Sequence, residues 1–200
     1  MNFVRIFPLA SFFLFCFVLT GRILYLRRKG VQLSPGPGRK PWFMLVAYPV
    51  FGVLFLIWLT ELVLLAFQLQ GILLPAWVTM KITDLPFLEI LGVALVLVSL
   101  VLLLLTLLHF RWSLRFGHDR HNQGELITTG VFSLSRNPFF LSVTLYFLGL
   151  ALLYISFLFI TMALLTLGSV HFFILKEERF LHNYYGEEYR NYAEKVGRYF

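Results

Sequence analysis

Residues 139–175 read FFLSVTLYFLGLALLYISFLFITMALLTLGSVHFFIL and contain no Asp, Glu, Lys or Arg. A helix that crosses a membrane needs about 20 mainly apolar residues. The run is therefore too long for one crossing and matches two tight ones, with a turn near Tyr154–Ser156. This pattern predicts a helical hairpin within a membrane.

The composition of the whole chain excludes an ordinary soluble domain. Of its 200 residues, 59% are hydrophobic and only 14% are charged, and the mean hydropathy is +0.80. A soluble domain usually has about 25% charged residues. The polar surface is too small to cover a water-soluble globule of this size.

Three further apolar runs precede the hairpin, at residues 6–26, 42–67 and 86–108. The first is too long for the core of a signal peptide. We predict an all-α integral membrane protein of about five transmembrane helices, the last two a hairpin followed by short cytoplasmic C-terminal helices. Residues 1–109 would hold three N-terminal helices, and residues 110–200 a functional core.

The distribution of Lys and Arg predicts the orientation. Basic residues gather after the first and third runs and in the final 25 residues, whereas the loop after the second run holds only Lys81. Basic loops stay on the cytoplasmic side, so the N-terminus is expected outside. Residues 110–138 and 176–200 would then share the cytoplasmic face.

Several other functions are not expected. The net charge of +7 comes from basic residues at the ends of apolar runs, where they face lipid headgroups rather than nucleic acid. The single cysteine, Cys16, excludes an internal disulfide. His109 and His118 match no metal-binding spacing, so no metal site is predicted.

Arg136, Asn137 and Pro138 stand directly before the hairpin. Proline suits the first turn of a helix, and a helix N-terminus favours an anionic group. The Arg136 guanidinium would add a planar fork for a carboxylate or phosphate. Equally, Arg136 would contact lipid phosphate and Pro138 would simply start a helix.

Lys176-Glu177-Glu178-Arg179 follows the hairpin directly. Paired acids are unfavourable at a helix C-terminus near anionic lipid. They would need a cationic ligand or nearby arginines, unless Lys176 and Arg179 suffice on a solvated face.

Aromatic residues recur at helical spacing beyond these acids, and Gly186 is expected to end that helix. A second short helix is expected from Glu187 to Val196. Such an aromatic stripe usually packs on the membrane surface and less often encloses a flat ring such as adenine. Its members are Phe180, Tyr184, Tyr185, Tyr189 and Tyr192.

Two isolated polar residues lie within apolar runs. His171, on the cytoplasmic half of the last span, is a functional candidate, although a packed, hydrogen-bonded histidine explains it equally well. Glu61 lies on the opposite half of its span, and we expect it to be structural.

The two polar motifs and the hairpin between them resemble the isoprenylcysteine carboxyl methyltransferase / phospholipid methyltransferase superfamily. The resemblance covers residues 110–200 and depends on LITTGVFSLSRNP at 126–138 together with KEERFL and YGEEY at 176–189. It implies S-adenosylmethionine as cofactor, bound at the cytoplasmic edge of the membrane.

By this resemblance, Arg136 and Asn137 would hold the methionine end of the cofactor, and Glu177 and Glu178 would face its ammonium. Arg136 and His171 would be catalytic, with His171 as the proton acceptor. The full set of expected cofactor-binding residues is Leu126, Thr129, Gly130, Val131, Arg136, Asn137, Pro138, Phe140, Glu177, Glu178, Tyr185 and Tyr189.

The implied reaction is methyl transfer to a lipophilic acceptor: an isoprenylcysteine-like carboxylate, a thiol or a lipid headgroup. Three departures from the family pattern bear on the acceptor more than on the cofactor: Asn137 in place of histidine, Phe140 in place of tyrosine, and Ser142 in place of glycine. The expected partners are a lipophilic or lipidated substrate and membrane lipids. The alternatives are a sterol-reductase-like enzyme that uses NADPH and a non-enzymatic membrane adaptor.

Overall fold

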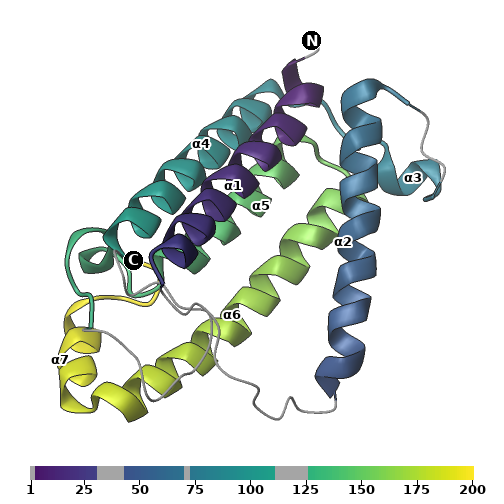
Figure 1. Ribbon diagram of the computed structural model, residues 1–200. Helices are drawn as coiled ribbons and strands as arrows, with labels where there is room; N and C mark the ends of the chain where they lie inside the picture. Colours follow the sequence, from purple (N-terminus) through teal and green to yellow (C-terminus); the bar gives the residue numbers. More distant parts are fainter. Residues whose placement is uncertain (1–2, 31–42, 70–72, 111–125) are drawn as a thin grey trace.

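The computed structural model of the protein describes residues 3–30, 43–69, 73–110 and 126–200 (Figure 1). These residues form helices and connecting segments without a β-strand, which confirms the predicted all-α class. The elements are α1 (Phe3–Arg28), α2 (Phe43–Phe67), α3 (Ala76–Thr79), α4 (Pro86–His109), the 3₁₀ helix η1 (Gly130–Ser133), α5 (Pro138–Leu153), α6 (Phe157–Tyr185) and α7 (Glu187–Lys195).

Within the described chain, α1, α2, α4 and α6 are long and apolar enough to cross a membrane. Their outer surfaces carry exposed phenylalanines and leucines, as lipid-facing surfaces do. The protein is therefore an integral membrane protein. Arg111, Arg115, Arg120, His118 and Gly124 lie outside the described residues, and the predicted orientation remains a prediction.

The predicted hairpin is present, but its two helices differ in length. It turns at Tyr154–Ser156, where the Ser156 hydroxyl accepts a hydrogen bond from the Phe159 amide and caps α6. α5 has 16 residues and is shorter than a full span, whereas α6 has 29. The difference arises because α6 continues as one helix through Lys176–Arg179 and ends only at Gly186, whose φ is +54°.

Glycine allows α4 and α5 to pack backbone against backbone. A Cβ atom added to Gly92 of α4 would lie 2.5 Å from the Leu153 amide nitrogen, and one added to Gly149 would lie 2.8 Å from the Gly92 carbonyl oxygen. Small residues allow such close approach in membrane helices. This is the most extensive helix–helix contact among the described elements.

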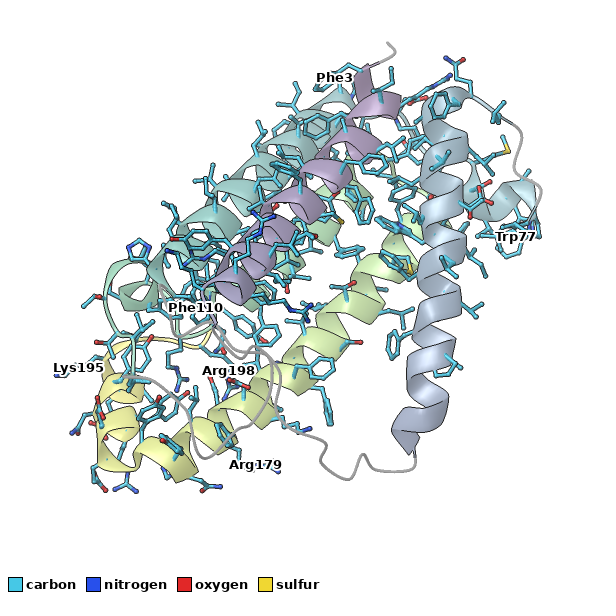
Figure 2. The ribbon with its side chains drawn as sticks, viewed as in Figure 1. Phe3, Trp77, Phe110, Arg179, Lys195 and Arg198 are labelled. Atoms are coloured by element: carbon cyan, nitrogen blue, oxygen red, sulfur yellow. The ribbon has the colours of Figure 1, made fainter. Side chains whose placement is uncertain are left out.

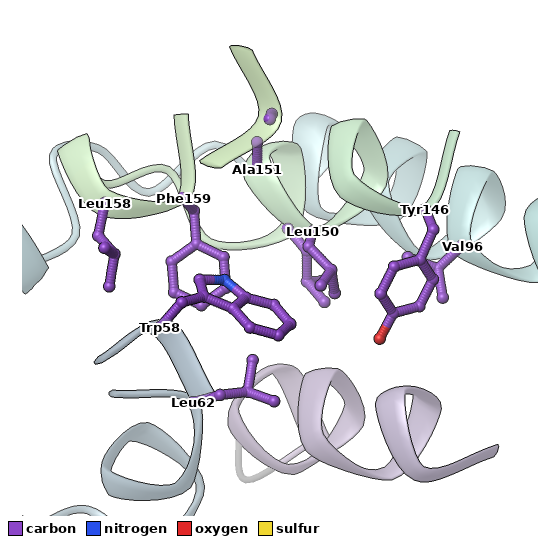
Figure 3. Packing of buried hydrophobic residues seen from close by; sticks show 10 residues of the cluster. Trp58, Leu62, Val96, Tyr146, Leu150, Ala151, Leu158 and Phe159 are labelled. Atoms are coloured by element: carbon purple, nitrogen blue, oxygen red, sulfur yellow. The ribbon is translucent and has the colours of Figure 1, made fainter. Parts of the chain in front are cut away.

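The largest buried cluster lies where α2 meets the hairpin. Trp58 of α2 packs against Phe147 and Phe159, with ring centroids 5.3 Å and 6.4 Å away, and Leu62 lies beside it (Figure 3). The Tyr146 hydroxyl, 3.2 Å from the Ser11 hydroxyl, ties α5 to α1.

The helices have two distinct ends (Figure 1). The start of α1, the end of α2, α3 and the α5–α6 turn lie at one end. The start of α5, the end of α6, α7 and the C-terminus lie at the other. The two polar motifs are therefore neighbours in space, as predicted.

Candidate functional site

The site is centred on Glu178, a carboxylate of α6 whose residue is only 9% exposed. The Asn137 side-chain amide donates to Glu178 Oε1 at 3.2 Å, and Arg136 Nη2 lies 3.4 Å from the same oxygen. The antiparallel hairpin brings these residues together, because the start of α5 lies beside the C-terminal part of α6. The first polar motif thus supplies cationic and amide partners to the second.

The last residues of the chain complete this cluster. Arg198 Nε donates to both oxygens of Glu178, at 3.1 and 3.0 Å, and Nη2 donates to Oε2 at 2.8 Å. These hydrogen bonds raise the pKa of the Arg198 guanidinium. Figure 2 labels Arg198 beside α6 at this end of the molecule.

We call residues 196–200 the C-terminal strap. Its backbone also engages the start of α5: the Arg136 amide donates to the Gly197 carbonyl at 3.0 Å, and the Arg198 carbonyl accepts from Asn137 at 3.2 Å and Ser135 at 3.3 Å. Polar donors at the start of α5, where the sequence predicted an anionic ligand, thus form hydrogen bonds with carbonyl groups of the strap.

Arg198 is a site residue that was not predicted from the sequence. The signal was available, because an acid pair that needs cationic partners lies within a segment ending in Arg198. However, the strap has no helical or strand periodicity that would have indicated where this side chain points.

A cavity of about 460 Å³ opens between α6, α7 and the strap. It falls within the range of small-molecule sites, about 300–1,000 Å³. Its charged lining consists of four arginines and two glutamates: Arg136, Arg179, Arg190, Arg198, Glu178 and Glu194. The excess of positive charge favours a ligand with an anionic group.

Two buried polar atoms beside this cavity form no hydrogen bond of standard geometry in the described structure: Arg136 Nε and the Tyr189 hydroxyl. Tyr189 is 3% exposed. Burial raises its pKa to about 12, with the Glu178 charge adding to the shift and the Arg136 charge opposing it. Hydrogen bonding between the Arg136 side chain and the Tyr189 hydroxyl also lowers this pKa, so the two groups interact with each other beside the cavity.

Tyr192 has a structural role. Its hydroxyl donates to the Phe132 carbonyl at 2.6 Å and attaches α7 to η1. Burial raises the pKa of Tyr192 as well. The aromatic stripe is therefore divided, because the Tyr192 hydroxyl attaches α7 to η1 whereas the Tyr189 hydroxyl interacts with Arg136 beside the cavity.

The predicted site residues differ in where they lie relative to the cavity. Arg136, Glu178 and Tyr189 line the cavity, whereas Glu177 and Tyr185 are half-buried outside its lining. Pro138 begins α5, and Phe140 lies in its first turn. The remaining predicted residues lie on or before η1: Leu126, Thr129, Gly130 and Val131.

Gly130 fits its position closely. It has φ +66°, and a Cβ there would lie 2.1 Å from the His109 ring. The role of the 126–131 segment in cofactor binding remains a prediction.

His171 lies on α6 and contacts the strap rather than the cavity lining. Its Nδ1 shares a hydrogen bond of 2.6 Å with the Tyr199 hydroxyl, and the two rings are stacked at 6.3 Å. His171 is thus hydrogen-bonded, as one of the two predicted alternatives states, but it is exposed rather than packed in the interior. Its role as proton acceptor remains a prediction.

The fold and the site define a helical membrane protein with a mixed-charge pocket at one end of its helices. A family model described as phospholipid methyltransferase matches residues 87–188, about half of the chain. The chain belongs to the phospholipid methyltransferase family. The match runs from α4 to the start of α7 and includes Arg136, Asn137 and Glu178. No curated protein matches the chain.

Proposed function

We propose that the protein transfers a methyl group from S-adenosylmethionine to a lipophilic acceptor at the membrane edge, on the cytoplasmic side. The main observation is the convergence of Arg136 and Glu178, from two distant motifs, on one cavity of about 460 Å³. Membership of a lipid-methylating family supports the reaction class.

The residues present fit the cofactor's functional groups. Arg136 and Arg198 supply cationic forks for a carboxylate, and Arg136 Nε has an unmet donor. Glu178 fixes both guanidinium groups and is an acid for the ammonium. Tyr189 would contribute a hydroxyl, and Asn137 would hold Glu178 in place. We keep Glu177, Phe140, Tyr185 and the 126–131 segment as further cofactor contacts.

The bound cofactor supplies an electrophilic methyl group on a sulfonium. The protein's task is then to align the acceptor and to exclude water. A carboxylate acceptor needs no base, whereas a thiol or an amine must lose a proton first. His171 is the proposed proton acceptor, and its hydrogen bond to Tyr199 holds the ring in place.

The acceptor would approach sideways from the bilayer. Phe172 and Phe173 of α6 are 57% and 44% exposed, and they precede Glu178 by one to two turns. Apolar surface thus continues from the lipid-facing helix to the charged pocket. We propose a lipid headgroup as the first acceptor to test, followed by an isoprenylcysteine-like carboxylate and a thiol.

Calorimetric titration of the purified protein with S-adenosylmethionine tests the cofactor. We expect binding that Arg136→Ala abolishes and Glu178→Gln weakens strongly. The matched control is Glu188→Gln, since Glu188 is exposed and lies outside the lining of the cavity. Normal binding by both site variants would overturn the assignment, and binding of NADPH instead would favour a reductase.

Transfer of labelled methyl groups from S-adenosylmethionine into a total lipid extract, followed by mass spectrometry, identifies the acceptor. Labelled lipid that disappears with Arg136→Ala would support the proposal. Cofactor binding without methylation of lipid, prenylcysteine or thiol substrates would contradict it and favour an adaptor.

A further inference from the structure

A second cavity, of about 310 Å³, lies at the opposite end of the helices from Glu178. It is lined by residues of α1, α2, α3 and the α5–α6 turn, including Arg5, Glu61, Gln68, Thr79 and Tyr154. Leu158 of this cavity and Glu178 lie 20 residues apart on α6, about 30 Å along its axis. The two cavities are therefore separate sites.

Glu61 is an unsatisfied acid within this cavity. The residue is 5% exposed, and its Oε1 has no hydrogen-bond partner among the described residues. Trp58, one turn earlier on α2, has an Nε1 that is also unpartnered, so this donor does not satisfy the carboxylate. A lone buried carboxylate costs several kcal/mol, and an acid within a membrane-spanning helix indicates a functional site.

Among the described residues, no cation forms an ion pair with Glu61. Lys81 pairs with Asp84 at 2.6 Å and also with Glu89. Arg5 lines the same cavity but is exposed, and it forms no ion pair with Glu61. The cavity thus presents one unpartnered carboxyl group and one cation without joining them.

We propose that this cavity binds the zwitterionic headgroup of an aminophospholipid. The primary ammonium would pair with Glu61 and donate to Oε1, and the phosphate would pair with Arg5. A primary ammonium carries three N–H donors, which a trimethylammonium lacks, so the unmet Oε1 selects the former. The cavity volume suits a headgroup, and leucines in its wall would meet the start of the acyl chains: Leu64, Leu65 and Leu69.

This inference is independent of the proposed methyl transfer, since no residue of the Glu178 cavity takes part. The same ammonium–phosphate chemistry occurs in a lipid and in free phosphoethanolamine. The lipid is favoured because the cavity lies at the end of helices long and apolar enough to cross a membrane, and because leucines stand beside its polar groups.

Native mass spectrometry of the full chain tests the proposal, with phosphatidylethanolamine, phosphatidylcholine and phosphatidylglycerol of identical acyl chains as probes. We expect phosphatidylethanolamine to bind at least about tenfold more tightly than phosphatidylcholine, as a charge-assisted hydrogen bond would give. Glu61→Gln should remove this preference, and Arg5→Gln should weaken both lipids alike. Glu187→Gln, at the other end, should leave the preference unchanged.

Equal binding of phosphatidylethanolamine and phosphatidylcholine by the unaltered protein, or an unchanged preference in Glu61→Gln, would overturn the proposal. Saturable binding of free phosphoethanolamine as tight as that of the lipid would overturn the lipid assignment. Thermal unfolding in detergent establishes that each variant is folded before lipid is added.

Discussion

Glu178 and Glu61 are both buried glutamates, at opposite ends of the same bundle, and their surroundings differ sharply. Glu178 has partners from Arg136, Asn137 and Arg198 within 3.4 Å. Glu61 has an oxygen without any partner among the described residues. The comparison shows that burial alone does not give an acid its role. The supply of protein donors decides whether a buried acid also anchors the structure, as Glu178 does, or depends on a ligand for a partner, as Glu61 does.

The largest expected effect comes from Glu178→Gln. The change leaves Arg136 and Arg198 facing each other without an anion, and breaking a buried ion pair costs about 3–5 kcal/mol. Because Arg198 is partly exposed, we expect a loss of stability near the lower end of this range. Thermal or denaturant unfolding in detergent measures the loss, with the exposed Glu187→Gln as control. A loss below about 1 kcal/mol would show that Glu178 is not an anchor.

Gly92→Ala tests the contact that positions α5, and hence Arg136, relative to the rest of the bundle. The new methyl group would collide with the backbone of Leu153, so α4 and α5 must separate at a cost of about 1–3 kcal/mol. Cofactor affinity at the Glu178 site should fall with stability. Gly168→Ala is the control, because no atom lies within 4 Å of the added carbon. Equal stability of the two variants would contradict the close contact.

Glu61→Gln should change the stability of the protein in the opposite direction from Glu178→Gln. Without bound lipid, the amide removes an uncompensated buried charge, so stability should stay equal or rise by about 1 kcal/mol. Unfolding in lipid-free detergent measures this difference. A loss comparable to that of Glu178→Gln would show that Glu61 is a structural anchor, as the sequence analysis expected.

Tyr189→Phe gives the smallest effect and depends on pH. Tyr189 titrates at about 12 in the folded protein and at about 10 when unfolded. Its contribution is fully present below pH 10 and is lost as pH rises towards 12, because only the unfolded chain then releases the proton. At neutral pH the variant should match the parent in stability. At pH 11 the parent should lose about 1 kcal/mol that the variant retains.

These values are measured by unfolding at pH 8 and pH 11 in the parent and the variant. An identical pH dependence of parent and variant would show that the hydroxyl is not buried.

The sequence predicted the hairpin, its turn and the meeting of Arg136 with Glu178, because each depends on local hydrophobicity and on antiparallel helix geometry. It did not predict Arg198 as a partner, since the direction of the strap is set by contacts with Asn137 and Ser135. The cavity at Glu61 was also missed. Residues from four separate segments form it, and only the packed structure shows that Arg5 and Glu61 share a space.

The shortness of α5 has a consequence for how a lipid would be handled. Sixteen residues span about 24 Å, less than the roughly 30 Å of a bilayer's apolar layer. α6 continues from Glu178 to Tyr185 for about another 10 Å. The Glu178 carboxylate thus lies about two turns before the end of α6, beside the start of α5. A lipid headgroup would then reach Glu178 while the acyl chains of the lipid remain in the membrane. Exposing those chains to water would cost about 0.8 kcal/mol per methylene, and this approach avoids that cost.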